Sequence, residues 1–229
     1  LTMLLVSLHI TAQSQGWPAG YGGVMLQGFY WDSFDDSKWT ILESQADELS
    51  PYFSLIWVPQ SGKCLNPTSM GYDPYYYFNQ NSSFGTAAEL KHMIATFKAK
   101  GLGTIADVVI NHHNTMGWWS FPEETYNGTT YQFKTTDIVA NDDSQNTGYV
   151  TADQARKDGV TLGTHNNDGD DWPGMRDLDH KSDNVKTIVK AYEQFLLKEM
   201  GYVGFRYDMV KGFAGSHIAE YNDAAKVEY

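Results

Sequence analysis

The sequence predicts an α/β fold in which helices cover a parallel sheet, because strand-like and helix-like segments alternate along the chain. The expected strands are short, apolar and rich in β-branched and aromatic residues, and they span 24–31, 55–60, 103–112 and 203–210. The expected helices show apolar residues at helical spacing, and they span 39–52, 86–101, 184–201 and 216–229. Such alternation is typical of a parallel sheet that is either doubly wound or closed into a barrel.

The clearest helix prediction concerns residues 86–101. Thr86 and Glu89 have the spacing of a capping box, an apolar stripe follows, and Gly101 provides a stop. By contrast, the polar, Gly- and Asp-rich stretch after the third strand has little periodicity. Because loops of this length rarely lack structure in a compact domain, we expect an inserted subdomain over 113–180. The main domain would then comprise 16–112 and 181–229.

Composition limits the functional classes. The chain has 229 residues, of which 41% are hydrophobic, and this is enough for a packed core. A net charge of −12 disfavours nucleic acid as a partner. Cys64 is the one cysteine, so it forms no internal disulfide and no zinc site by itself.

The first 15 residues resemble the remnant of a secretory signal peptide. An apolar stretch from Met3 to Ile10 precedes small and polar residues. We therefore expect a secreted or periplasmic protein, with a buried first strand as the alternative interpretation. The stretch is too short to cross a bilayer, so no membrane partner is expected.

The segment "VGFRYDMVKG" (203–212) carries charge inside an otherwise buried strand. Arg206 and Asp208 lie on one face, and Phe205 and Tyr207 lie on the other. Because an unpaired buried charge is costly, the two charges must face an ion-pair cluster or a polar pocket. Ligand sites of parallel α/β folds lie at the carboxyl ends of strands. This position favours a functional role for Asp208 over a structural salt bridge.

The third strand ends in further polar residues, "DVVINH" (107–112). Asp107 lies deep enough to pair with Arg206 on the neighbouring strand, and that cation would keep Asp208 ionised, as a carboxylate nucleophile requires. His112 could donate a hydrogen bond to a substrate hydroxyl, although a lone histidine is more often structural.

The segment "NNDGDDWPGMRDLDH" (166–180) is rich in oxygen ligands. Asp168, Asp177 and the Asn111 side chain could hold Ca²⁺ together with backbone carbonyls. A solvated acidic loop is the alternative. Tyr72 and the pair Trp118–Trp119 offer flat faces suited to sugar rings, whereas the aromatic residues that follow Tyr72 are expected in the core.

Together, "DVVINH", "MRDLDH" and "GFRYDMVKG" resemble the alpha-amylase family of retaining glycoside hydrolases, most closely the plant and archaeal alpha-amylases. "QGFYWDSF", "WVPQSG", "GYDP" and "FGTAAELK" extend the resemblance from Val24 to the end. It implies a (β/α)₈ barrel, of which this chain is the N-terminal half, with the subdomain inserted after the third strand. One departure is Arg176, which stands where proline is usual in the family.

The resemblance also implies roles for individual residues. Asp208 would be the nucleophile and Arg206 would orient it. Substrate-binding residues would be His112, Lys211, Tyr72 and Asp107. Calcium ligands would be the side chains of Asn111, Asp168 and Asp177 and the carbonyls of Asp170 and Gly212. Asp168 is placed only by its distance from Asp177.

The sequence thus predicts a secreted, calcium-dependent alpha-amylase that cleaves α-1,4-glucans such as starch and glycogen, and that is a monomer when full length. An oligosaccharide-specific or debranching relative, or a non-catalytic glucan- or calcium-binding protein, are the alternatives. The family's general acid and third carboxylate lie on later strands. We therefore expect the 229-residue chain alone not to hydrolyse starch.

Overall fold

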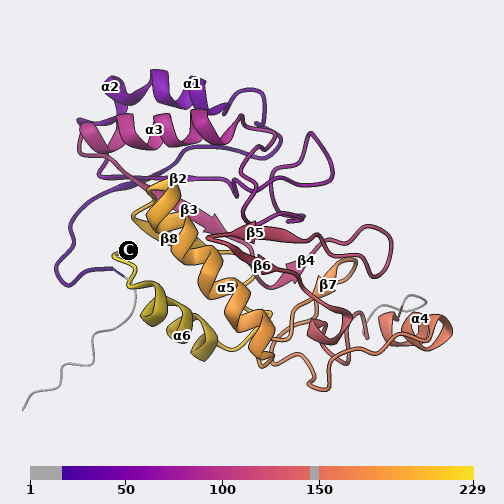
Figure 1. The fold of residues 1–229 in the computed structure, drawn as a ribbon. Coiled ribbons are helices and arrows are strands. Elements are labelled where there is room, and N and C mark those ends of the chain that lie inside the picture. The colour runs from indigo at the N-terminus through magenta and orange to yellow at the C-terminus, as the bar shows by residue number, and fades with distance from the viewer. Residues whose placement is uncertain (1–16, 145–149) are drawn as a thin grey trace, which may run out of the picture.

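The computed structural model describes residues 17–144 and 150–229, and the expected signal peptide remnant (1–15) lies outside these residues. Its main sheet consists of the parallel strands β1 (Met25–Gln27), β2 (Leu55–Val58), β3 (Gly103–Val108) and β8 (Gly204–Tyr207). They are neighbours in the order β1-β2-β3-β8 (Figure 1). Strands that follow one another along this chain therefore pair directly, as in a partial β/α barrel, and the order does not reverse as in a doubly wound sheet.

The first strand is shorter than the predicted 24–31. Gly28 still donates its N–H to the Trp57 carbonyl (2.8 Å), but the backbone N–H of Ser33 donates to the carbonyl of Tyr30 at 3.1 Å. The chain therefore turns after Gly28 and places the aromatic residues of "FYWDSF" in a loop at the carboxyl end of β1. The apolar character of this stretch reflects its place beside the candidate site.

The helices lie outside the sheet. Their bounds are α1 (Trp39–Ser44), α2 (Ala46–Leu49), α3 (Ala87–Ala99), α5 (Asp183–Phe195) and α6 (Gly215–Ala225). Figure 1 shows α1, α2 and α3 together on one side of the strands, with α5 and α6 on another. The predicted helix 39–52 is divided at Gln45 (φ −90°, ψ 0°).

The other helix predictions hold with changes at their ends. Residues Leu196–Met200 continue α5 as a π-helix. The last helix ends at Ala225, because Lys226 adopts a left-handed conformation (φ 58°). The capping box of α3 is confirmed: the Glu89 N–H donates to Thr86 Oγ1 (3.2 Å), and the Thr86 N–H donates to Glu89 Oε2 (2.7 Å).

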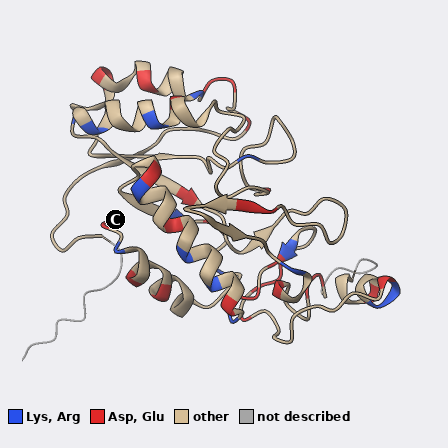
Figure 2. Cartoon of the chain, in the orientation of Figure 1, with Lys and Arg blue, Asp and Glu red and all other residues tan. Residues whose placement is uncertain are grey.

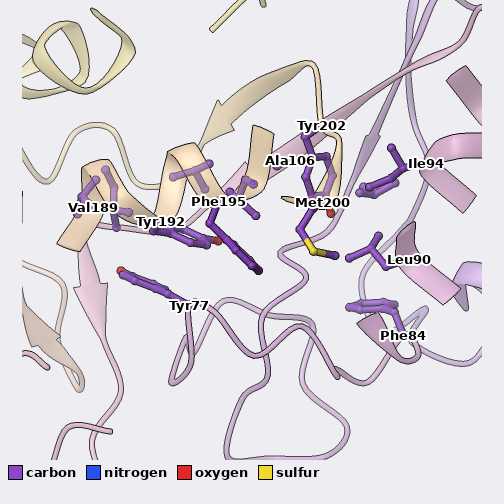
Figure 3. Packing of buried hydrophobic residues seen from close by; sticks show 14 of the residues in the cluster. Tyr77, Phe84, Leu90, Ile94, Ala106, Val189, Tyr192, Phe195, Met200 and Tyr202 are labelled. Atoms are coloured by element: carbon purple, nitrogen blue, oxygen red, sulfur yellow. The ribbon is translucent and has the colours of Figure 1, made fainter. Parts of the chain in front are cut away.

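The core joins the loop after β2 to α5. The rings of Tyr77 and Tyr192 stack with centroids 4.3 Å apart, and Phe195 packs nearby (Figure 3). Tyr77 and Tyr192 are 2% and 0% exposed. Burial of one such side chain contributes about 1.5–3 kcal/mol, so these contacts fix the segment that carries Tyr72.

The stretch predicted as an inserted subdomain contains several short elements. They are β4 (His112–His113), β5 (Glu124–Tyr126), β6 (Thr129–Tyr131), a 3₁₀ helix (Thr135–Asp137), α4 (Thr151–Asp158) and β7 (Arg176–Asp177). Strand β4 pairs antiparallel with β7, and β5 with β6. The described part of the stretch is therefore structured, while its independence as a domain stays a prediction.

Charged residues of both signs are interspersed along α4 and α5 (Figure 2). Within 17–144 and 150–229, no helix has the length and apolarity needed to cross a membrane.

Candidate active site

The predicted pairing of charges on β3 and β8 is confirmed. The two strands lie in register with Asp107 opposite Arg206. Arg206 Nη1 donates to both oxygens of Asp107 (2.9 and 3.2 Å) and to Asp208 Oδ1 (2.7 Å). One guanidinium therefore bridges a buried carboxylate and a more exposed one, at the carboxyl ends of two neighbouring strands.

Asp107 is the buried one of the two carboxylates that Arg206 bridges. Its side chain is 0% exposed, against 22% for Asp208, and it also accepts hydrogen bonds from Tyr72 OH (2.8 Å) and Trp57 Nε1 (3.1 Å). Burial raises the pKa of Asp107 to about 6, although Arg206 and Tyr72 act to lower it. Asp107 is thus covered by Tyr72 and Arg206, and it acts on its surroundings through the hydrogen bonds to these two residues.

Arg206 remains a permanent cation in this position. Burial acts to lower its pKa, but Asp107 and Asp208 outweigh burial, and the pKa is raised overall. The guanidinium also lies over the Trp57 ring, 4.7 Å from its centroid. Its contacts with Asp107, Asp208 and Trp57 hold the guanidinium in one position, and the guanidinium in turn fixes the orientation of Asp208.

His112 is less accessible than the resemblance implies. Its residue is 1% exposed, and Nε2 lies 3.0 Å from the Tyr72 carbonyl oxygen. The Trp172 ring stacks on it with centroids 5.3 Å apart and planes 14° apart. Burial lowers the pKa of His112, so the imidazole is neutral at neutral pH. In this arrangement Trp172 covers the ring that was expected to meet a sugar hydroxyl.

Two tryptophans of the site were missed by sequence analysis. Trp172 is 38% exposed, and Trp31, which is 68% exposed, stacks with Tyr72 at a centroid distance of 6.0 Å. A signal was present in both cases, since each tryptophan is directly adjacent to an Asp, in "YWDS" and "DDWPG". The pair Trp118–Trp119 lies elsewhere, with Trp118 beneath the Arg176 guanidinium at 5.0 Å.

Three segments converge beside these residues: the end of β3, the loop around 166–171 and the turn after β8. Lys211 Nζ lies 3.1 Å from Asp170 Oδ2, and the Asp170 N–H donates to the Lys211 carbonyl (2.9 Å). A Cβ on Gly212 would lie 1.9 Å from Asn111 Oδ1, so a side chain there requires the backbone to move. Glycine at 212 therefore permits the close approach of Asn111.

The predicted calcium ligands are brought together with one exception. Asn111 Nδ2 donates to Asp177 Oδ1 (3.1 Å), and Asp177 Oδ2 accepts from Asn167 Nδ2 (2.9 Å) and the Trp172 N–H (3.0 Å). The backbone carbonyl of Asp170 belongs to the same group, because it accepts a hydrogen bond from Asn167 Nδ2 (3.2 Å).

Asp168, the exception, is directed toward α6. It accepts from the Ala214 N–H (3.0 Å), lies 3.1 Å from His217 Nε2 and lies 3.5 Å from Lys181 Nζ. Spacing along the sequence does not determine which way a loop side chain turns. The adjacent Asn167 is the residue that reaches Asp177.

A second group of oxygen ligands, also missed, lies nearby. Carboxylate oxygens of Asp142, Asp143 and Asp171 lie within 4.8 Å of one another and could hold a metal ion. The buried Arg176 contacts two of them, Asp142 at 2.9 Å and Asp143 at 3.2 Å. This position therefore already contains a cation, supplied by the residue that departs from the family pattern.

The donor set fits calcium. Burial raises the pKa of Asp177 to about 8; the Trp172 N–H lowers it, and Asp142, Asp171 and Asp143 raise it further. A buried carboxylate surrounded by other carboxylates is stabilised by a divalent cation. Carboxylate, amide and carbonyl oxygens are the ligands that calcium prefers.

Strand order and site together define a class: a β/α-barrel protein with a fixed, partly exposed carboxylate at the carboxyl ends of its strands. The comparison with protein families gives the particular family. The model described as "Alpha amylase, catalytic domain" matches residues 49–228. The chain therefore belongs to the alpha-amylase family, and the resemblance stated from the motifs is confirmed.

Curated relatives agree with this assignment. The chain is 29% identical over 221 residues to alpha-amylase 3, chloroplastic, of Arabidopsis thaliana, covering 93% of this chain and 22% of that protein. It is 27% identical over 223 residues to the glucan 1,4-alpha-maltotetraohydrolase of Roseateles saccharophilus, covering 88% of this chain and 36% of that protein. The chain thus spans about a fifth of the length of the first relative and about a third of the length of the second.

Solved structures share the fold. Alpha-amylase I of Eisenia fetida, crystallised as a variant with maltohexaose, has a TM-score of 0.63 at 19% identity, covering 88% of this chain and 40% of that one. An alpha-amylase from Malbranchea cinnamomea has a TM-score of 0.57 at 22% identity, covering 89% and 44%. These likenesses support the partial barrel.

Proposed function

We propose that the protein hydrolyses α-1,4-glucosidic bonds of starch- and glycogen-type glucans, with Asp208 as the nucleophile and with retention of configuration. The observation that carries the proposal is the bridge from Arg206 to Asp208. The guanidinium binds Asp208 Oδ1 at 2.7 Å and Asp107 fixes the guanidinium from below. Asp208 Oδ2 therefore remains as the oxygen that attacks the anomeric carbon.

The reaction needs a second carboxyl group. Retaining glycosidases place an acid about 5–5.5 Å from the nucleophile, where it protonates the leaving oxygen and later activates water. Asp107 does not suit this role, because its side chain is 0% exposed and binds Arg206, Tyr72 and Trp57. We infer that the acid comes from outside these 229 residues, and that the chain alone does not hydrolyse starch.

Calcium is part of the proposal. Asn111 and Asp177 would hold the ion with the carbonyls of Asp170 and Gly212. The bound ion would supply positive charge that offsets the buried Asp177 carboxylate. Asp177 already joins Asn111 at the end of β3 to Asn167 and to the backbone of Trp172, the residue whose ring covers His112.

Secretion into the extracellular or periplasmic space is proposed from the apolar N-terminal sequence alone, and one relative is chloroplastic. An oligosaccharide-specific activity is the second candidate, because two maltotetraohydrolases are among the relatives at 27% and 26% identity. A non-catalytic glucan-binding role does not require the Arg206–Asp208 bridge.

The test is release of reducing sugar from soluble starch by the full-length protein and its Asp208→Asn variant. We expect kcat to fall by at least about 100-fold, with a smaller change in KM, because the lost group acts on the reacting carbon. Asp223→Asn is the matched control, since Asp223 is 76% exposed and pairs with Lys226 on the surface of α6. If Asp208→Asn keeps most of its turnover, the nucleophile assignment fails.

A further inference from the structure

The ring pair formed by Trp172 and His112 suggests a feature of substrate binding beyond bond cleavage. Trp172 stacks on His112 through one face, yet 38% of the residue stays exposed. His112 Nε2 in turn lies 3.0 Å from the Tyr72 carbonyl oxygen. Tyr72 OH donates to Asp107, which binds the same guanidinium as Asp208. Trp172 is therefore one side chain away from Tyr72.

The backbone around Trp172 is held in place by carboxylates. The Trp172 N–H donates to Asp177 Oδ2 (3.0 Å), and the Gly174 N–H donates to Asp143 Oδ1 (2.8 Å). Pro173, between them, has a fixed φ. An aromatic side chain on a backbone held at both sides loses little conformational freedom when it binds a ligand, and such preorganisation favours affinity.

Polar groups accompany the exposed indole. Asp170, two residues before Trp172, pairs with Lys211 at 3.1 Å, and both side chains are largely exposed (64% and 69%). A glucose ring has one face of C–H groups and an edge of hydroxyls. An aromatic face and a carboxylate–ammonium pair two residues away along the chain can match both, because the ring covers the C–H face and the charged groups bind the hydroxyls.

A second aromatic surface includes Tyr72, the residue whose carbonyl oxygen lies 3.0 Å from His112 Nε2. Trp31 and Tyr72 stack with centroids 6.0 Å apart and planes 20° apart. The site thus presents two aromatic pairs, Trp31–Tyr72 and Trp172–His112, connected by the contact between His112 and Tyr72. One glucose unit occupies one surface, so a glucan needs at least two linked units to reach both, and a longer chain fills both surfaces in several alternative positions whereas a disaccharide does so in one.

We propose that Trp172 is a specificity-determining residue that stacks against a glucose unit neighbouring the one at Tyr72. It thereby favours longer α-1,4-linked oligosaccharides. This proposal rests on the proposed function, because it assumes a glucan in the same site. The alternative is that Trp172 only covers His112 and contributes to folding.

Binding of maltohexaose and of maltose, measured by calorimetric titration, separates these roles. All titrations use the Asp208→Asn background, so that hydrolysis does not consume the sugar. Adding Trp172→Ala should weaken maltohexaose about 3- to 10-fold and maltose less, since one aromatic contact is lost. Trp172→Tyr should restore maltohexaose binding to within about 2-fold of the parent. Tyr52→Ala is the control, since Tyr52 is 74% exposed and precedes β2 at the opposite end of the sheet.

Two outcomes overturn the proposal. In the first, Trp172→Ala binds maltohexaose as tightly as the parent. In the second, Trp172→Tyr loses as much affinity as Trp172→Ala and both variants lose thermal stability, which assigns Trp172 a structural role. All of these variants are made in the full-length protein. If the full-length parent binds no maltohexaose and the full-length wild type releases no sugar from starch, the proposed function itself fails. Hydrolysis of starch by the full-length wild type with unchanged binding by Trp172→Ala rejects the specificity role alone.

Discussion

Replacing Asp107 by alanine tests the support beneath the nucleophile. The change removes the acceptor for Arg206, Tyr72 and Trp57 together. Breaking a buried ion pair costs about 3–5 kcal/mol, and a buried donor left without a partner costs about 1–3 kcal/mol. Because the Arg206 side chain is 35% exposed, water compensates part of this loss. We expect the free energy of unfolding to fall by about 3 kcal/mol.

Asp107→Asn is the matched variant. The amide can keep an acceptor oxygen at the Oδ2 position for Tyr72 and Trp57, but its NH2 group then faces Arg206 and the negative charge opposite the guanidinium is lost. Removing one charge of a buried pair is destabilising, whereas the two retained hydrogen bonds and the exposed part of Arg206 reduce the cost. We therefore expect a loss of about 1–2 kcal/mol at pH 7, smaller than the loss for Asp107→Ala.

Urea denaturation at pH 7, followed by circular dichroism, measures both changes. Asp223→Ala, on the exposed surface of α6, should match the wild type. The reasoning is wrong if Asp107→Ala lies within about 0.5 kcal/mol of the wild type, which is the range of surface substitutions. It is also wrong if Asp107→Asn costs as much as Asp107→Ala.

Three further outcomes are expected. Burial raises the pKa of Glu193 from 4.5 to about 8, so the folded protein keeps a proton that the unfolded chain releases, and stability falls as pH rises from about 5 to 8. Glu193→Gln should flatten this dependence in urea titrations, and an unchanged slope would contradict the assignment. Removing calcium with a chelator should lower the thermal midpoint by the equivalent of about 3 kcal/mol, if the calcium concentration before removal is about 100 times its Kd. The shift should be smaller in Asn111→Ala. An unchanged wild-type midpoint argues against the site. Lys211→Ala should raise KM several-fold and leave kcat nearly unchanged, since Lys211 is 69% exposed. A fall in kcat as large as the rise in KM would place Lys211 in the chemical step.

Features that depend on local or periodic rules could be predicted from the sequence. The capping box of Thr86 and Glu89 formed as expected because both partners lie within one helical turn. The bridge from Asp107 through Arg206 to Asp208 followed from the alternation of side chains on two neighbouring strands. The division of the first helix at Gln45 carries no comparable signal, since apolar residues on both sides of it are buried.

Features that depend on how loops fold back could not be predicted. Asp143 and Asp171 lie 28 positions apart, and only the folded chain brings them together and brings Asp143 to Arg176. Likewise, spacing placed Asp168 near Asp177, whereas the loop turns Asn167 toward that carboxylate. His112 was expected to face substrate, but the stacking of Trp172 on it is a contact between distant segments.

The central claim is that Asp208 forms a covalent bond with the sugar. An activated fluorinated maltosyl fluoride, which glycosylates a retaining enzyme and is released slowly, makes the intermediate long-lived enough for peptide mass spectrometry of the full-length protein. The account predicts one added glycosyl group, on the peptide that contains Asp208, and its absence in Asp208→Asn. A label on another carboxylate, or hydrolysis of starch with inversion and without any label, would contradict it.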